Sequence, residues 1–147
     1  MDDTDRQILQ LLRRDGRAPV SEIARRVGLS AAPCARRIER MEKDGVIRGY
    51  AAIVDDGRAG MLQALTEIRL LGATDSGEIQ GIAESVPEIE ESYSVAGTTD
   101  AFFRLRVRDV EHLQQVIDTI RRTGKVEGTR TCMVIRTWTR PPELPGT

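Results

Sequence analysis

The chain of 147 residues is long enough for one or two small domains and too short for a large multidomain enzyme. Hydrophobic residues make up 39% and charged residues 31%, a balance typical of a folded chain with a well-solvated surface. Two cysteines and one histidine argue against a disulfide framework, a metal site, a cofactor and most histidine-based catalysis. No apolar run reaches the ~18 residues of a membrane span, and the N-terminus is too charged for a signal peptide, so we expect a cytoplasmic protein.

The net charge of −1 conceals an asymmetry between the two parts of the chain. Residues 1–50 contain 11 Lys and Arg against 8 Asp and Glu, whereas residues 51–147 contain 11 against 15. The first part is therefore positive by three charges and the second negative by four. A basic part joined to an acidic part indicates that one of them meets a polyanion such as a nucleic acid.

Apolar residues at helical spacing, capping residues and glycines mark out three short helices in residues 1–50. The helices are expected to begin at Asp2, Pro19 and Ser30. Asp5 stands in the first turn of the first helix, where negative charge suits the helix dipole. Gly28 supplies the left-handed backbone conformation that allows a sharp turn between the second and third helices.

The second and third helices have the pattern of a helix-turn-helix. Cys34, Ile38 and Met41 recur at i, i+4 and i+7 in the third helix and are expected to face the core. The opposite side of this helix carries Ala32, Arg36, Arg40 and Lys43, with Arg37 flanking them.

This surface suits the major groove of DNA, which admits a helix whose first residues are small. Arg36 and Arg40 are candidates for guanine edges, the other cations are candidates for phosphates, and the helix N-terminus at Ser30 can also receive a phosphate. The alternative is a solvated surface helix, because two glutamates lie between the arginines. The predicted DNA-binding residues are Arg17, Ser30, Ala31, Ala32, Pro33, Arg36, Arg37, Arg40 and Lys43.

The remaining chain has the pattern β-α-β-β-α-β. Its expected strands cover residues 62–71, 89–96, 101–107 and about 128–139. Two helices on one face of a four-stranded antiparallel sheet form the ferredoxin-like arrangement, so we expect an α+β protein in which a winged helix-turn-helix domain precedes a ferredoxin-like sandwich. The expected divisions are the helical domain at 1–50, a linker at 51–60 with a connecting strand at 50–54, the sandwich at 61–140 and a tail at 141–147.

The free face of the predicted sheet is neither clearly polar nor clearly apolar. Phe102 shares it with Glu67, Arg104 and Arg106, and we expect Glu67 to pair with one of the two arginines across the strands. Such a mixed face suits a partner sheet better than bulk water, so we expect a homodimer. One side of the second strand is expected to carry Ile89, Glu91, Tyr93 and Val95.

Four runs of this sequence resemble the leucine-responsive/asparagine regulator (Lrp/AsnC) family of bacterial and archaeal transcription factors. They are DRQIL at 5–9, VGLS-x-x-PC at 27–34, Gly97-x-x-Asp100 and Thr129-Arg130-Thr131. The resemblance covers almost the whole chain and implies a helix-turn-helix joined to a ferredoxin-like effector domain. It also implies dimers that often assemble into octamers or other rings around which DNA bends. In many members of the family, amino acids bind in clefts between the dimers.

The resemblance further implies where an effector would bind. Asp100 can pair with an ammonium group, and loop amides near a glycine can hold a carboxylate. The alternative is that Asp100 only stabilises its turn and the threonines are ordinary strand residues. The family usually has aromatic residues around the loop aspartate where this chain has Thr99 and Ala101. This difference predicts either a wider or more polar cleft or an altered contact between dimers. The implied lining residues are Gly97, Thr98, Thr99, Asp100, Thr129 and Thr131.

We therefore expect a sequence-specific DNA-binding regulator, not an enzyme, that responds to an amino acid or a related small molecule. Siroheme decarboxylase subunits resemble the same family, but those enzymes need histidines around a large tetrapyrrole, and His112 is the single histidine of this chain. The remaining alternative is an oligomeric metabolite sensor whose helical domain has become structural.

Overall fold

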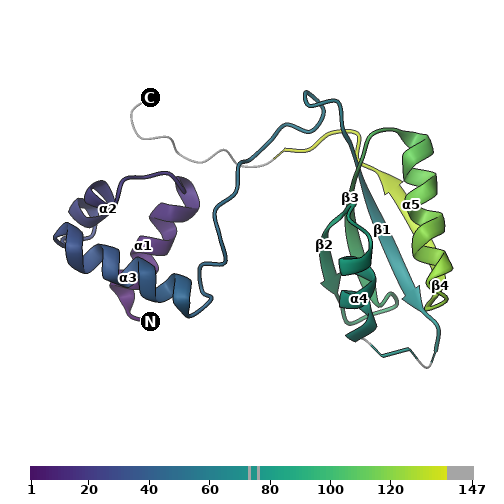
Figure 1. Ribbon diagram of the computed structural model, residues 1–147, viewed down its shortest axis with the longest axis horizontal. Coiled ribbons are helices and arrows are strands. Elements are labelled where there is room, and N and C mark those ends of the chain that lie inside the picture. The colour runs from purple at the N-terminus through teal and green to yellow at the C-terminus, as the bar shows by residue number, and fades with distance from the viewer. Residues whose placement is uncertain (73, 76, 139–147) are drawn as a thin grey trace. The chain divides into compact units, whose positions relative to one another are not determined.

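The computed structural model describes residues 1–72, 74–75 and 77–138 (Figure 1). They divide into two compact units, one holding Met1–Ile53 and the other Val54–Thr137, and each unit has its own hydrophobic core. Within the described residues, no helix is long and apolar enough to cross a membrane. The end of the predicted last strand at 139 and the predicted tail at 141–147 lie outside the described residues.

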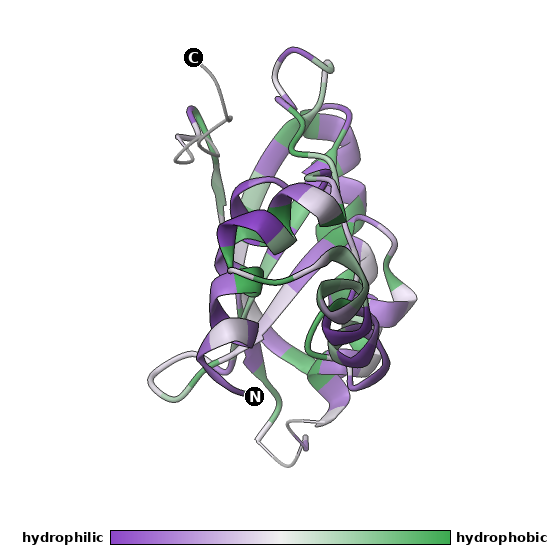
Figure 2. Ribbon diagram, turned by 90° about the vertical axis from the view of Figure 1, so that its left-hand side faces the viewer, coloured by the Kyte–Doolittle hydropathy of each residue, from purple (hydrophilic) through white to green (hydrophobic). Residues whose placement is uncertain are grey.

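The first unit is built from three helices. They are α1 (Asp3–Arg14), α2 (Val20–Arg26) and α3 (Ala31–Lys43). Hydrophilic and hydrophobic residues alternate along these helices (Figure 2), and the hydrophobic side chains meet in a small core. Cys34, Ile38 and Met41 are all buried in that core, which confirms the predicted inner face of α3.

The expected capping residues of α1 and α3 behave differently. Asp2 caps α1 in a reciprocal capping box, in which the backbone N–H of Asp5 donates to Asp2 Oδ1 at 2.9 Å and that of Asp2 to Asp5 Oδ2 at 3.0 Å. Ser30 occupies the N-cap position of α3 in extended conformation, but its side chain makes no capping hydrogen bond. Gly28 has a φ of +70°, so the predicted left-handed turn before α3 is confirmed.

The second unit is a four-stranded antiparallel sheet with two helices on one face (Figure 1). Its elements are β1 (Leu62–Leu70), α4 (Gly77–Ser85), β2 (Ile89–Ser94), β3 (Ala101–Val107), α5 (Val110–Arg122) and β4 (Val126–Met133). The strand order β2-β3-β1-β4 is that of the predicted ferredoxin-like fold. The core-facing residues predicted for the third strand are all fully buried, and they are Ala101, Phe103, Leu105 and Val107.

A β-bulge in β2 overturns the predicted face of that strand. Ile89 lies opposite Leu105 and packs against the core, whereas Glu91 lies opposite Arg104 on the free face. The register shifts between Ile89 and Glu91, so the two residues do not share a side as alternation alone would require.

The predicted pair of Glu67 with an arginine across the sheet is also wrong. The register places Phe102 opposite Glu67. Arg104 instead lies 2.6 Å from a carboxylate oxygen of Glu91 on β2, and Arg106 lies 2.8 Å from one of Glu90. The bulged strand therefore supplies the carboxylates that the sequence pattern assigned to β1.

Two strand boundaries differ from expectation. Residues 50–54 form no strand. Among the described residues, no strand pairs with this segment, so its backbone has no hydrogen-bonded ladder to join. The last strand begins at Val126 rather than 128 and ends at Met133, whereas the described residues 134–138 lie outside any strand. The sheet pairing of β4 with β1 shifts in register between Arg69 and Leu70, which accounts for the earlier start.

Candidate functional site

The outer surface of α3 is the first candidate site. Its side chains project from a helix whose other face is fixed in the core, so their positions follow from the packing of that core. Among the described residues, Arg36 and Lys43 are exposed and form no ion pair. Arg17 is exposed in the turn after α1, where its backbone N–H donates to Asp15 Oδ1 at 2.8 Å. The small residues predicted to approach DNA lie at the start of α3, where Ser30, Ala31 and Ala32 are exposed and Pro33 is partly buried.

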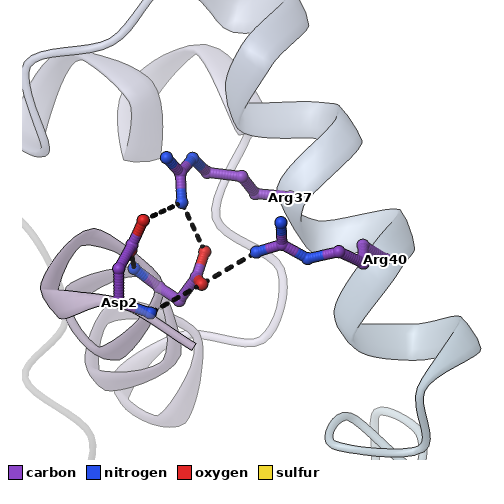
Figure 3. Close-up of polar contacts among 4 residues, drawn as sticks. Asp2, Arg37 and Arg40 are labelled. Carbon is purple, nitrogen blue, oxygen red and sulfur yellow. Dashed lines mark hydrogen bonds and ion pairs between the residues drawn. The ribbon is translucent and has the colours of Figure 1, made fainter.

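The other two arginines of α3 are bound to carboxylates at the start of α1 (Figure 3). Arg37 Nη1 donates to Asp2 Oδ2 at 2.7 Å and to Asp5 Oδ1 at 2.8 Å, and Arg40 Nη2 donates to Asp5 Oδ2 at 2.8 Å. The side chain of Asp5 is only 1% exposed, whereas that of Arg40 is 53% exposed. We call these four residues the Asp–Arg cluster.

The hydrogen bonds of the Asp–Arg cluster keep its groups charged. Burial would raise the pKa of Asp5, but the hydrogen bond from Arg37 and the capping bond from Asp2 hold this pKa below its ordinary value. The backbone bond from Asp5, followed by the bond from Arg37, lowers the pKa of Asp2. The two carboxylates in turn raise the pKa of Arg37, so Asp2, Asp5 and Arg37 are ionised near neutral pH.

The pairing within the Asp–Arg cluster was not predicted from the sequence, although a signal for it was present. Asp5 precedes Ile8 by three residues, so it shares the apolar stripe of α1 rather than its solvated side. An acidic residue on a buried stripe requires a cationic partner. The bonds to Asp5 also place Arg40 beside α1 in this structure, although the helical pattern assigns Arg40 to the same outer side as Arg36.

One of the two glutamates of α3 is bound as well. The hydroxyl of Tyr50 donates to Glu42 Oε1 at 2.7 Å. Burial and this hydrogen bond raise the pKa of Tyr50 to about 12. Glu42 is therefore held by the segment that follows α3 and does not pair with Arg36 or Lys43 among the described residues.

The loop before β3 is the second candidate site, and its polar groups hold the loop to β1. Asp100 Oδ2 accepts the backbone N–H of Leu70 at 2.8 Å, and Thr99 Oγ1 donates to the carbonyl of Ile68 at 2.8 Å. Gly97 and Thr98 are exposed and occupy the tip of the loop. The Asp100 carboxylate is itself exposed, so it can still accept a further donor beside its bond to Leu70.

The two threonines of β4 lie on the other side of β1. Thr129 is the register partner of Ile68, the same residue that receives the hydroxyl of Thr99. The Thr129 hydroxyl accepts from Arg121 Nε at 3.0 Å, and the Thr131 hydroxyl lies 3.1 Å from that of the buried Thr66. The structure therefore brings Thr129 and the loop to one end of β1, with Thr131 two residues further along β4.

A groove of about 650 Å³ lies between α4 and the edge strand β2. Its walls include Ile79 and Ala83 of α4 and Ile89 and Ser94 of β2. None of the effector residues predicted from the sequence lines this groove.

Comparison with known proteins assigns both units to one family. Residues 1–48 match the family of winged helix-turn-helix DNA-binding domains, and residues 63–144 match the Lrp/AsnC ligand binding domain. The chain belongs to the Lrp/AsnC family. This Lrp/AsnC protein is a DNA-binding transcriptional regulator, because both the helix-turn-helix and the ligand-binding domain of that family are present.

The relatives of this Lrp/AsnC regulator cover nearly its whole length. It is 31% identical over 99% of its residues to the HTH-type transcriptional regulator FL11 of Pyrococcus horikoshii, of which it covers 96%. The crystal structure of the leucine response regulatory protein of Mycobacterium tuberculosis is similar with a TM-score of 0.85 at 33% identity, and the match covers 95% of this chain and 96% of that one. A transcriptional regulator from Neisseria meningitidis, solved as a complex with L-Met, has a TM-score of 0.81 at 29% identity, with 99% and 96% of the two chains covered.

Proposed function

We propose that this regulator inserts α3 into the major groove of DNA and reads base edges with Arg36. The single observation that supports this proposal is that the outer side of α3 combines exposed Arg36 and Lys43 with small residues at its start. The small residues permit close approach, and a free guanidinium can bind a guanine edge through two hydrogen bonds. Lys43 and Arg17, with the free hydroxyl of Ser30, are assigned to phosphates.

Replacing Arg36 tests this assignment. If Arg36 reads a base, Arg36→Ala will weaken binding to an operator selected with the wild-type protein by about 1–3 kcal/mol and affect random-sequence DNA much less. Lys43→Ala is the matched control, since loss of a phosphate contact weakens both DNAs equally. An equal effect of Arg36→Ala on both DNAs would assign Arg36 to a phosphate, and no effect on either would remove α3 from the interface. Fluorescence anisotropy on labelled duplexes measures all of these affinities.

We further propose that the loop 97–100, with Thr129 and Thr131, binds an amino acid or a related molecule. The complex of the Neisseria relative with L-Met supports this class of ligand. The loop and Thr129 both lie at one end of β1, and this proximity supports the proposed location of the ligand site. In this proposal the exposed Asp100 carboxylate binds the ammonium group and the backbone near Gly97 binds the carboxylate.

We also propose that the free face of the sheet pairs two copies of the chain and that the dimers assemble further into octamers. The proposal is supported by the apolar side chains on that face, where Leu65 is 44% and Tyr93 is 50% exposed. A dimer would present two α3 helices to two half-sites of DNA.

A further inference from the structure

The Asp–Arg cluster divides the cationic residues of α3 into two groups. Arg36 and Lys43 are exposed and unpaired among the described residues, whereas Arg37 and Arg40 are each bonded to a carboxylate of α1. The cluster contains two positive and two negative groups, so its net charge is zero. A DNA phosphate approaching α3 therefore meets fewer net positive charges than the sequence of the helix suggests.

We propose that Asp5, assisted by Asp2, is a positioning residue that neutralises Arg37 and Arg40 and thereby limits the sequence-independent attraction of α3 to DNA. The inference rests on the proposed role of α3 as the DNA-binding helix. It goes beyond that role, because it assigns to two acidic residues outside the helix-turn-helix the control of non-specific affinity.

The burial of Asp5 makes this neutralisation persistent. Its side chain is 1% exposed, and each of its two oxygens accepts a guanidinium N–H at 2.8 Å. A phosphate that drew Arg37 and Arg40 away would leave a buried carboxylate without a countercharge, which is strongly unfavourable. The phosphate would also have to replace the bond from Arg37 to Asp2 at 2.7 Å. Both arginines therefore stay bound to the carboxylates when the protein meets DNA of any sequence.

Counterion release makes the difference between the two groups of cations measurable. A cation that neutralises a DNA phosphate releases condensed counterions and steepens the dependence of log K on log salt by about 0.9. Lys43 can act in this way, but an arginine that is already neutralised by a buried carboxylate cannot. Arg37 is expected to contribute much less to the salt dependence than Lys43, although both residues lie on α3.

The consequence for the regulator is a weaker sequence-independent attraction to DNA. Sequence-independent binding is almost entirely electrostatic, whereas the choice among operators depends on contacts to base edges. Neutralising two arginines lowers the affinity for DNA of every sequence, the operator included, and leaves the reading of bases by Arg36 intact. The choice among sequences then depends on the contacts that Arg36 makes with base edges, while the protein is held less tightly on DNA in general.

The first test compares Lys43→Gln with Arg37→Gln in the full chain. The readout is the slope of log K against log salt for a random-sequence duplex, measured by fluorescence anisotropy. Lys43→Gln is expected to make the slope shallower by about 0.9, and Arg37→Gln by no more than about a third of that amount. Equal changes for the two variants would overturn the inference. If Lys43→Gln itself has no effect on DNA binding, the proposed function of α3 fails instead, so the two failures are distinguishable.

The second test removes the buried carboxylate. Asp5→Asn is expected to bind the random duplex several-fold more tightly at low salt and to steepen its slope by about 0.9 to 1.8, because one or two arginines are released. Asp3→Asn is the matched control, since it removes the same charge from the same turn but, among the described residues, Asp3 pairs with Arg6 alone, at 2.5 Å. A weaker affinity or an unchanged slope in a folded Asp5→Asn protein would show that Asp5 is only structural.

Two safeguards keep the second test decisive. Circular dichroism and a thermal melt establish that Asp5→Asn retains its helices. If it does not, Asp2→Asn replaces it, because Asp2 is 55% exposed and its loss leaves both bonds to Asp5 in place. Asp2→Asn is expected to tighten non-specific binding more than Asp3→Asn does, because it removes one of the two carboxylates that bind Arg37. An effect equal to that of Asp3→Asn would overturn the inference.

Discussion

Asp5 has three structural roles in the first unit. It completes the capping box of α1, it lies on the buried stripe of that helix, and it binds two arginines of α3. A buried carboxylate is tolerated because every one of its hydrogen bonds comes from a charged group or from a helix N-terminus. The first unit therefore depends on the ionised form of this residue.

The lowered pKa of Asp5 predicts that acid destabilises the first unit. Because the folded-state pKa lies below that of the unfolded chain, the stabilisation is complete above the ordinary pKa of an aspartate. It is lost as the pH falls through the lower pKa of the folded state, when the bonds from Arg37 are broken by protonation. Urea unfolding followed by helical circular dichroism between about pH 7 and about pH 3 measures this loss. Asp5→Asn is expected to have a flatter pH profile, and identical profiles for the two proteins would contradict the assignment.

Asp100 has a structural bond and a proposed ligand bond on one carboxylate. Its Oδ2 accepts the backbone N–H of Leu70, and that bond can be kept by an amide oxygen. Only a charged carboxylate, however, gives a strong ion pair with an ammonium group. The variants Asp100→Asn and Asp100→Ala therefore separate the bond to Leu70 from the proposed bond to the ligand.

A thermal-shift screen over the twenty amino acids provides the measurement. Ligand that binds only the folded state stabilises it by about 2.7 kcal/mol at a hundredfold excess over its Kd, which appears as a higher Tm. Asp100→Asn is expected to keep the basal Tm and lose the ligand-induced increase. Asp100→Ala is expected to lose that increase and also about 0.5–1.5 kcal/mol of stability from the missing hydrogen bond. A full ligand response in Asp100→Asn would show that this residue only holds its turn.

The strands show how far periodicity alone can be used to predict this fold. Alternation located β3 to the residue and identified its buried face, because a central strand with one face on the core must keep a strict period of two. It gave the wrong face for part of β2, an edge strand in which a bulge shifts the register between Ile89 and Glu91. A bulge adds one residue without any change in composition, so the pattern of apolar residues does not reveal it.

The helices of the first unit show a similar limit for the candidate site. Helical spacing predicted the buried face of α3 and the exposure of Arg36 and Lys43 correctly. It did not predict that Arg37 and Arg40 are bound to α1, because this contact joins residues more than thirty positions apart. Spacing within one helix describes that helix, whereas an ion pair between helices depends on how they pack.

At the scale of the whole molecule, the proposed dimer depends on the free face of the sheet. The apolar part of that face is contributed by β1, β2 and β3 and is interrupted by the ion pairs of Arg104 and Arg106. The apolar side chains of this face are exposed to water, and their burial against another surface would be energetically favourable. The proposed dimer would cover it.

Leu65→Glu tests the proposed dimer. Burial of Leu65 against a partner is worth about 1.5–3 kcal/mol in each protomer, and a charge at this position is not tolerated in a dry interface. The variant is expected to elute as a monomer in size-exclusion chromatography with light scattering, with its secondary structure unchanged. Val110→Glu is the control, because Val110 is 59% exposed on α5, which covers the opposite face. A dimer that survives Leu65→Glu would place the contact elsewhere.

The short turn before β1 is anchored to the sheet rather than to the helices that precede it. Asp56 is only 8% exposed; its carbonyl accepts the N–H of Met61 at 2.8 Å, and its carboxylate accepts a hydrogen bond from Gln63. Arg106 Nε lies 3.0 Å from the same carboxylate in an ion pair without hydrogen-bond geometry. A chimera that joins the second unit to another DNA-binding domain should therefore be cut upstream of Val54, since a junction after Gly60 would remove one of the two carboxylates that pair with Arg106.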